Sequence, residues 1–473
     1  MGYIEGEDRN QILMFPDSLD DYIKEDNPVR FVAAFVESLD LGQLGFGRAV
    51  PNQRGRNAYH PAMLLSLYIY GYLNRICSSR KLERESGRNL ELMWLMRKLT
   101  PDHKTIADFR KDNLGAIAKV CRRFKKLCGE MGLFGGELIG VDGSKFRAVN
   151  SKERSFNARK LERAIKRVEQ DIEDYLRELD ECDKDEAEIK KVSAEELREK
   201  IEKLKQRRAK YEQIGEELSK SEDGQVSLTD PDSRLMKSRQ GTHAGYNAQI
   251  AVDSKHKLIV AEDISGARSD RGQLTNIATQ AKEVLAVESL EVVADMGYYD
   301  CQDVKKCEEE SITPYVSKPA LSRNSGLFMK EDFVYDAQKD VYECPNGEEL
   351  KYVTHGKERE RGMRYYMNRE ACSGCPLKSQ CTRGAYRRIK RLEDEGVMEE
   401  MAARVRGDPE KMRLRKELVE HPFGTIKRGM DRGYFLMKRT AKVRTELKLT
   451  TLAYNMKRVM NIVGVKKMIE ALG

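Results

Sequence analysis

The sequence predicts an α/β fold whose strand-rich core carries a helical N-terminal region, a long helical hairpin and a cysteine-rich insertion. Three observations lead to this prediction. Helical periodicity dominates residues 1–130, apolar strand patterns recur within residues 137–318, and heptad spacing interrupts those strands over residues 151–222. Cysteines then cluster within residues 319–400, and a basic segment occupies residues 401–473.

The N-terminal region, residues 1–130, is predicted to form several short helices. The stretch "NPVRFVAAFVESLDL" has apolar residues at helical spacing, Pro61 suits a helix start, and Asp102 suits an N-cap. A DNA-binding bundle and a plain helical domain are both compatible with this pattern. Basic residues near the expected helices favour DNA binding: Arg54, Arg56, Arg75, Arg80, Lys81 and Arg84.

The core is predicted to alternate strands with helices. A first strand covers residues 137–150, and "GYNAQIAVDSK" with "KLIVAEDISG" reads as a hairpin of neighbouring strands. The helical stretch "LTNIATQAKEVL" precedes the strand "LEVVA", and "TPYVSK" gives a further short strand. The expected order is strand, helical insertion, two strands, helix, strand, helix, strand.

The insertion has two runs of heptad spacing joined by a polar turn. The first run contains Leu161, Ile165, Val168, Ile172, Tyr175 and Leu179, and the second contains Leu197, Ile201, Leu204, Tyr211 and Leu218. Two such runs predict an antiparallel coiled-coil hairpin. Its helices are either simply solvated or also form a contact between two copies of the chain.

Charge is distributed unevenly along the 473 residues, which carry 86 Lys and Arg against 78 Asp and Glu. Between Lys411 and Arg458 there are 14 basic and 4 acidic residues. Such a segment fits nucleic acid or an acidic membrane surface, and an ordinary solvated helix is the alternative. No apolar run reaches the length of a membrane span. Ten cysteines without a secretion signal indicate a reducing compartment, so we expect a cytoplasmic protein.

Two predicted strands run directly into a carboxylate followed by a glycine turn. Ile139 and Val141 lead into Asp142, and "LEVVA" leads into Asp295. A buried carboxylate is costly unless it is paired, so two of them at one sheet edge indicate a cation site. Carboxylate oxygens suit Mg²⁺ or Mn²⁺, and two such ions about 4 Å apart serve phosphodiester cleavage.

Glu420 is the candidate for a third carboxylate. Arg413, Lys416, Glu420 and Lys427 are spaced so that a continuous helix would carry all four on one face. One acid among three bases would hold a metal and also bind phosphates. Pro422 is expected to kink or restart this helix near His421.

Four cysteines form a second constellation. Cys344 lies in a tight turn, and Cys372, Cys375 and Cys381 follow as C-x2-C-x5-C. Four thiolates complete a tetrahedral structural Zn²⁺ site. A [4Fe–4S] cluster is the second alternative, and four reduced thiols without a metal are the third.

The motifs "VDGSK", "ADMGYYD" and "VEHPFGTIKRG" together resemble the DDE transposases of bacterial insertion sequences. The resemblance covers roughly residues 10–460 and implies a ribonuclease H-like fold. It places Asp142, Asp295 and Glu420 as the metal-binding catalytic acids. That superfamily carries Tyr-x2-Arg-x3-Glu-x6-Lys, whereas here Arg413 replaces the Tyr and Lys416 replaces the Arg.

The resemblance further implies metal-dependent cleavage and strand transfer of double-stranded DNA at transposon ends. Lys427 would contact a phosphate near the scissile bond, and Arg413, Lys416 and Arg428 are also expected to bind DNA. Synapsis of two ends makes a homodimer the expected assembly, with no membrane partner. A ribonuclease H-like nuclease without strand transfer and a catalytically silent DNA-binding protein are the alternatives.

Overall fold

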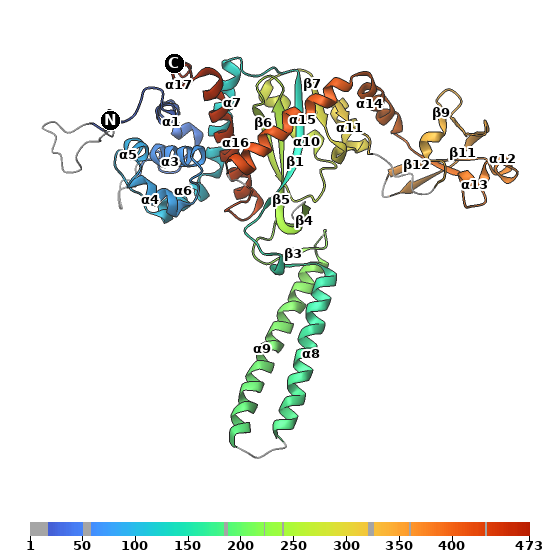
Figure 1. Cartoon of the computed structure of the whole chain (residues 1–473), viewed down its shortest axis with the longest axis horizontal. Helices are drawn as coiled ribbons and strands as arrows, with labels where there is room; N and C mark the ends of the chain where they lie inside the picture. Colours follow the sequence, from blue (N-terminus) through green and yellow to red (C-terminus); the bar gives the residue numbers. More distant parts are fainter. Residues whose placement is uncertain are drawn as a thin grey trace, which may run out of the picture.

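The structure is a computed structural model that describes residues 18–50, 58–183, 188–221, 223–238, 241–319, 326–358, 361–430 and 433–473. A central sheet lies between the N-terminal helices on one side and a smaller sheet on the other, and a long helical hairpin projects away from it (Figure 1). In these described ranges, no helix is long and apolar enough to cross a membrane.

The central sheet is mixed, with the order β4–β5–β1–β7–β8, and β6 also pairs with β5. β1 is antiparallel to β5 and parallel to β7, which in turn is parallel to β8. The predicted order of strands and helices is confirmed, although the short strand β4 was not predicted. The strands are β1 Leu138–Arg147, β4 Arg234–Ser238, β5 Gly241–Asp253, β6 Ile259–Ser265, β7 Leu290–Ala294 and β8 Ile312–Val316.

Helices cover both faces of this sheet. Ile139 and Val141 of β1 pack on α10 (Leu274–Leu285), α11 (Cys301–Glu309) and α14 (Glu395–Gly407) in one apolar cluster. On the opposite face, Val293 of β7 packs on Leu418 and Val419 of α15 (Pro409–Gly424). Because side chains alternate along a strand, Gly140 and Asp142 face α15.

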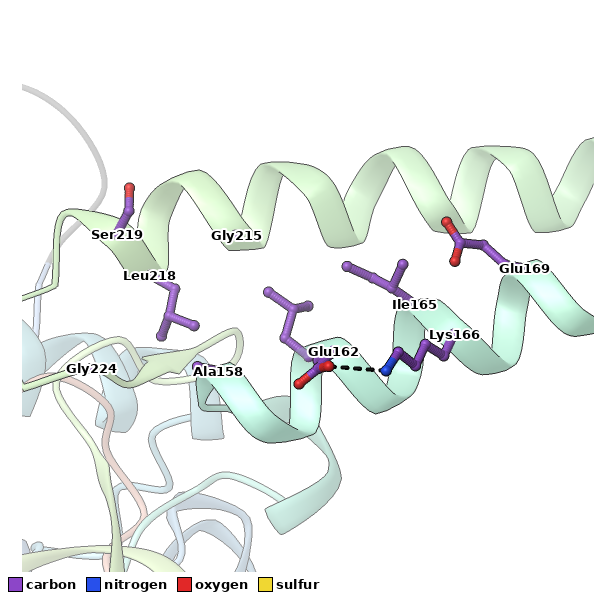
Figure 2. A pocket seen from close by; sticks show the side chains of 10 residues that line it. Ala158, Glu162, Ile165, Lys166, Glu169, Gly215, Leu218, Ser219 and Gly224 are labelled. Carbon is purple, nitrogen blue, oxygen red and sulfur yellow. Dashed lines mark ion pairs between the residues drawn. The ribbon is translucent and has the colours of Figure 1, made fainter.

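The inserted hairpin consists of α8 (Ala158–Asp183) and α9 (Glu188–Ser219), as the heptad runs predicted. Leu161 and Val168 of the first seam are buried, as are Leu197 and Ile201 of the second. A two-stranded sheet of β2 (Ser155–Phe156) and β3 (Val226–Ser227) closes its base. Near that base a pocket between the two helices is lined by apolar seam residues, with the Glu162–Lys166 ion pair at its rim (Figure 2).

Seven helices form the described N-terminal region. Asp102 accepts hydrogen bonds from the backbone N–H groups of Lys104 and Thr105, so its predicted role as an N-cap is confirmed. Arg75, Arg80, Lys81 and Arg84 are exposed, whereas Arg54 and Arg56 lie outside the described residues. The helices are α1 Pro28–Glu37, α2 Leu41–Leu44, α3 Pro61–Leu73, α4 Ser79–Ser86, α5 Leu90–Leu95, α6 His103–Asp112 and α7 Leu114–Glu130.

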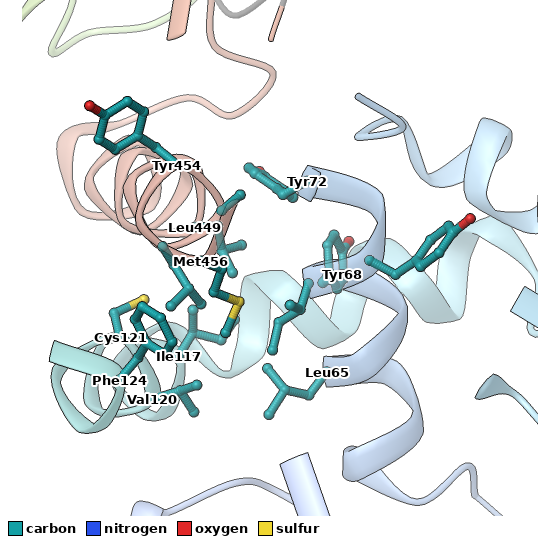
Figure 3. Packing of buried hydrophobic residues seen from close by; sticks show 14 of the residues in the cluster. Leu65, Tyr68, Tyr72, Ile117, Val120, Cys121, Phe124, Leu449, Tyr454 and Met456 are labelled. Carbon is teal, nitrogen blue, oxygen red and sulfur yellow. The ribbon is translucent and has the colours of Figure 1, made fainter. Parts of the chain in front are cut away.

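The N-terminal helices share one apolar core with the C-terminal helix α16 (Thr440–Val463), which is followed by α17 (Val465–Glu470). Figure 3 shows Leu65 and Tyr68 of α3 and Phe124 of α7 directed toward Leu449 and Met456 of α16. The described N-terminal helices and the C-terminal helix α16 therefore pack against each other, although the domain boundaries drawn from the sequence remain predictions.

The solvated-helix alternative for the basic C-terminal segment is wrong for α16. Leu447, Leu449, Thr450 and Asn455 are buried, and Lys448 turns inward to pair with the buried Glu262 at 2.9 Å. Lys125 of α7 pairs with the same carboxylate at 2.6 Å. Some of the basic residues of this segment are thus used in internal ion pairs, since two cations neutralise one buried acid.

The cysteine-rich region forms a separate antiparallel sheet in the order β13–β12–β11–β10–β9. Its small core contains Phe333, Tyr342, Leu350, Tyr366 and Ile389, with Cys344 and Cys381 packed against it. Its elements are β9 Val334–Asp336, β10 Val341–Glu343, β11 Glu349–Glu358, β12 Arg361–Met367, α12 Arg369–Ser373, α13 Lys378–Cys381 and β13 Arg388–Leu392.

The predicted restart of the helix near His421 is wrong. The α-helix continues through Pro422 to Gly424 and then passes into a π-helical turn over Thr425–Gly429. Pro422 and Phe423 are both buried, so packing compensates for the hydrogen bond that proline cannot donate. This continuation carries Lys427 back to the end of β1.

Gly140 sets how closely α15 approaches the sheet. A Cβ atom on Gly140 would lie 2.9 Å from Leu418 Cβ and 2.9 Å from Val419 Cγ1. We expect Gly140→Ala to lower the free energy of unfolding by about 1–3 kcal/mol, because the helix must shift outward. Urea unfolding of the two proteins measures this difference. An unchanged urea midpoint would mean that α15 can shift without lowering the free energy of unfolding. Gly215→Ala on the hairpin serves as the matched glycine control.

Candidate active site

Asp142 lies within β1 and Asp295 directly follows the neighbouring parallel strand β7. The glycine turn predicted after Asp142 is wrong, because β1 continues through Gly143 to Arg147 and stays paired with β5. The registered pairs of β1 and β7 end at Gly140 and Val293, and each aspartate lies two residues further along. Their carboxyl groups are therefore side by side, as the sequence predicted. Both belong to the sheet face that α15 covers, since Gly140 and Val293 contact that helix and a step of two residues keeps the same face.

The charge of Asp295 acts on Asp142. Burial, followed by the negative charge of Asp295, raises the pKa of Asp142 from its ordinary value of 3.8 to about 7. The backbone N–H of Gly143 donates to Asp142 Oδ1 at 2.9 Å, and this bond and the charge of Arg415 act in the opposite direction. Asp295 Oδ1 accepts from the N–H of Gly297 at 2.8 Å, which fixes its turn.

Glu420 lies on α15, the helix that faces this pair. Its side chain is exposed and has no hydrogen bond or ion pair with any residue that the structure describes. Leu418 and Val419 contact Gly140, and Lys427 contacts Ser144, so the helix segment that contains Glu420 runs beside Asp142. In this structure Glu420 does not join the two aspartates, because no three such side chains among the described residues form a group that could hold a metal ion.

Lys427 is half-buried against β1. Its Nζ donates to Ser144 Oγ at 2.5 Å and to the carbonyl oxygen of Lys145 at 2.8 Å, and it lies 4.6 Å from the ring centroid of Phe146. Burial lowers the pKa of Lys427 to about 8, although the negative charge of Asp142 opposes that shift. In this structure Lys427 therefore anchors the end of β1 beside the acids.

The other expected DNA contacts are all exposed. Arg413 pairs with Glu410 at 2.5 Å one turn earlier on α15, while Lys416 and Arg428 point into solvent. Arg415, which the sequence did not single out, is the base whose charge acts on Asp142. No local signal distinguishes Arg415 from its neighbours, because its role depends on how α15 is rotated against the sheet.

The four cysteines come from three separate parts of the small sheet and still lie near one another. Burial raises the pKa of the Cys381 thiol, and the charges of Cys372, Cys344 and Cys375 add to this effect. Over the described ranges of the chain, no three His, Cys, Asp or Glu side chains already stand in an arrangement that could hold a metal ion. The four thiols therefore lie near one another without forming a metal-binding arrangement in this structure.

Two family models match the chain. Residues 17–112 match a transposase domain (DUF772), and residues 343–460 match a transposase DDE domain. These two matches support a DDE-type transposase of the insertion-sequence kind, as the sequence predicted. The DDE match indicates an enzyme of metal-dependent DNA cleavage and transfer.

The DDE match contains Glu420, Lys427 and all four cysteines, whereas Asp142 and Asp295 lie outside both matched segments. No curated protein matches the chain. A cryo-EM structure of a piggyBac transposase synaptic complex with hairpin DNA aligns with 94% of this chain and 79% of that chain. The two proteins share 8% identity at a TM-score of 0.30, so this alignment supports no inference about fold or function.

Proposed function

We propose that this transposase cuts and joins DNA at one centre formed by Asp142, Asp295 and Glu420. The observation that carries the proposal is the pairing of two carboxylates on adjacent parallel strands, beneath the helix that bears a third. A ribonuclease H-like core fits this arrangement, because the sheet is mixed and its antiparallel hairpin lies at one edge.

The donor set fits a divalent cation with oxygen ligands. Two carboxylates are held together on a partly buried face, and burial together with the charge of Asp295 raises the pKa of Asp142. When bound, Mg²⁺ or Mn²⁺ would activate the attacking oxygen and stabilise the leaving oxygen. Asp142 and Asp295 would hold it from the rigid sheet, and Glu420 would complete the set from α15.

The neighbouring bases have separate roles in this proposal. Lys427 holds the end of β1 through Ser144 and the carbonyl oxygen of Lys145. When DNA binds, the ammonium group of Lys427 would pair with a phosphate near the scissile bond. The exposed side chains of Arg413, Lys416 and Arg428 would bind the DNA backbone, since exposed cations bind phosphates without regard to sequence.

We infer that the substrate is double-stranded DNA at the ends of the element that encodes this chain. Joining two ends requires two copies of the site, so a homodimer is the proposed assembly. The proposed location is the cytoplasm, in keeping with nine described cysteines that form no disulfide.

Cleavage of a duplex built from the DNA that flanks the gene tests this function. We expect Mg²⁺- or Mn²⁺-dependent nicking at the repeat boundary, followed by joining of the freed 3′-hydroxyl to a second duplex. A scrambled duplex is the control. Cutting without joining would favour the nuclease alternative, and binding without cutting in either metal would favour the silent DNA-binding alternative.

We further propose that Cys344, Cys372, Cys375 and Cys381 bind a structural Zn²⁺, with a [4Fe–4S] cluster as the alternative. The approach of four thiols around a core of only five buried residues supports this, because a metal would stabilise so small a sheet.

Metal analysis of the purified chain tests the cysteine proposal. We expect about one zinc per chain and loss of that metal in Cys375→Ser, with the small sheet becoming sensitive to protease. Cys77→Ser, at a buried cysteine of the N-terminal region, is the control and should keep the metal. Iron with visible absorbance would indicate the cluster, and a metal-free native protein would contradict both alternatives.

A further inference from the structure

A third aspartate, Asp270, lies against Gly143 of β1 and against the turn that follows Asp295. It stands between β6 and α10, and its side chain is 22% exposed. One oxygen, Oδ1, accepts from Asn247 Nδ2 at 2.7 Å, from Gln249 Nε2 at 2.8 Å and from Lys145 Nζ at 3.3 Å. These donors come from β1 and β5, so the carboxylate ties the two strands to the start of α10.

Gly143 leaves room for this carboxylate, and Gly297 lies at ordinary contact distance from it. A Cβ on Gly143 would lie 2.2 Å from Asp270 Oδ1, and a Cβ on Gly297 would lie 3.5 Å from Asp270 Oδ2. Gly143 directly follows Asp142, and Gly297 lies two residues after Asp295. Asp270 therefore fits between β1 and the turn of Asp295, on the face of β1 opposite to the Asp142 side chain.

The second oxygen, Oδ2, has no hydrogen-bond partner among the residues that the structure describes. It faces the turn of Asp295, where Gln249 also accepts a hydrogen bond from the buried hydroxyl of Tyr298. Asp270 adds to the negative potential at this end of the sheet, because its charge acts on both Asp142 and Tyr298. Lys145 is the cation that pairs with Asp270 directly.

We propose that Asp270 is a positioning residue that fixes the spacing of Asp142 and Asp295 and strengthens divalent cation binding through its charge, without itself binding the metal. This inference rests on the proposed centre, since it concerns the same cation. The role explains why a glycine follows Asp142, at the point where a Cβ would meet the Asp270 carboxylate.

Titration of the full-length chain with Mn²⁺ by calorimetry tests the role of the charge. Asp270→Asn keeps the shape and one acceptor oxygen, so the strand contacts remain and only the charge is lost. We expect the dissociation constant for Mn²⁺ to rise about 3–10-fold, because one negative charge near a divalent ion is removed. Asp263→Asn, at a carboxylate beside Arg444, is the matched control and should leave Mn²⁺ binding unchanged.

Lys145→Gln provides a test of opposite sign. It removes the cation that partly neutralises Asp270, so we expect Mn²⁺ to bind about 2–5-fold more tightly. A purely structural role would weaken binding in both variants or leave both unchanged, and either result would overturn the proposal. If Asp270→Asn fails to fold in thermal unfolding, Lys145→Gln decides alone, and failure to tighten counts against the proposal.

Asp142→Asn separates this inference from the proposed centre. If Asp142→Asn loses Mn²⁺ binding while Asp270→Asn and Lys145→Gln bind like the wild type, the centre stands and the role of Asp270 is wrong. If Asp142→Asn binds Mn²⁺ as well as the wild type, the proposed centre itself is wrong.

Discussion

Asp142→Asn is expected to abolish metal-dependent DNA cleavage and, at the same time, to stabilise the metal-free protein. An amide is a poor ligand for a hard divalent cation, so we expect the cleavage rate to fall by about 10³-fold or more. Cutting of a duplex from the flanking DNA at saturating Mg²⁺ measures this loss. If the variant cuts DNA within tenfold of the wild-type rate, Asp142 is not part of the catalytic centre.

The gain in stability follows from the raised pKa of Asp142. Between its ordinary value of 3.8 and about 7, the folded state holds a proton that the unfolded state has released. Stability from this group is therefore complete below pH 3.8 and is lost as the pH rises toward 7. At pH 8 the folded chain must hold an ionised Asp142 beside Asp295, and asparagine removes that cost.

We expect the free energy of unfolding of metal-free Asp142→Asn to exceed that of the wild type by about 1–3 kcal/mol at pH 8. At pH 4 the two proteins should differ little, because Asp142 is then protonated. Urea unfolding with a chelator at both pH values measures the difference. Asp295→Asn should give part of the same gain, since the charge of Asp295 contributes to the raised pKa. A stability difference independent of pH would contradict this account.

Local patterns in the sequence predicted much of the fold. The seam of the hairpin, the strands that lead into Asp142 and Asp295, and the cap at Asp102 all depend on residues close together in the chain. Alternation and heptad spacing record such features directly. The pairing of the two aspartates was also predictable, because a strand that runs into a buried carboxylate needs a partner or a cation.

Contacts between distant segments account for what the sequence did not reveal. Asp230, which resembles a linker turn residue, is fully buried and accepts from the Tyr246 hydroxyl and from the N–H of Arg439, each at 2.8 Å. Asp270 likewise depends on distant contacts, since its three hydrogen-bond donors lie on β1 and β5. The helix continues through Pro422 because the burial of Pro422 and Phe423 stabilises it by more than the lost backbone hydrogen bond costs.

The third acid is the part of the centre that most needs a direct test, and α15 offers a matched pair. Glu417 and Glu420 are one helical turn apart, and both are exposed. Glu417 lies 4.0 Å from Lys257, whereas Glu420 has no partner in the described part of the chain. Neither substitution by glutamine should change the free energy of unfolding by more than about 0.5 kcal/mol, because both sites are on the surface.

Glu420→Gln is expected to lower the cleavage rate by about 10²–10³-fold, whereas Glu417→Gln should remain within about twofold of the wild type. The reason is position, since Glu420 lies on the stretch of α15 between the contacts to Gly140 and to Ser144, beside Asp142. The same duplex assay at several Mg²⁺ concentrations measures both rates. If instead Glu417→Gln is inactive and Glu420→Gln is not, the third acid is Glu417. If both variants are as active as the wild type, α15 supplies no third acid to the aspartate pair.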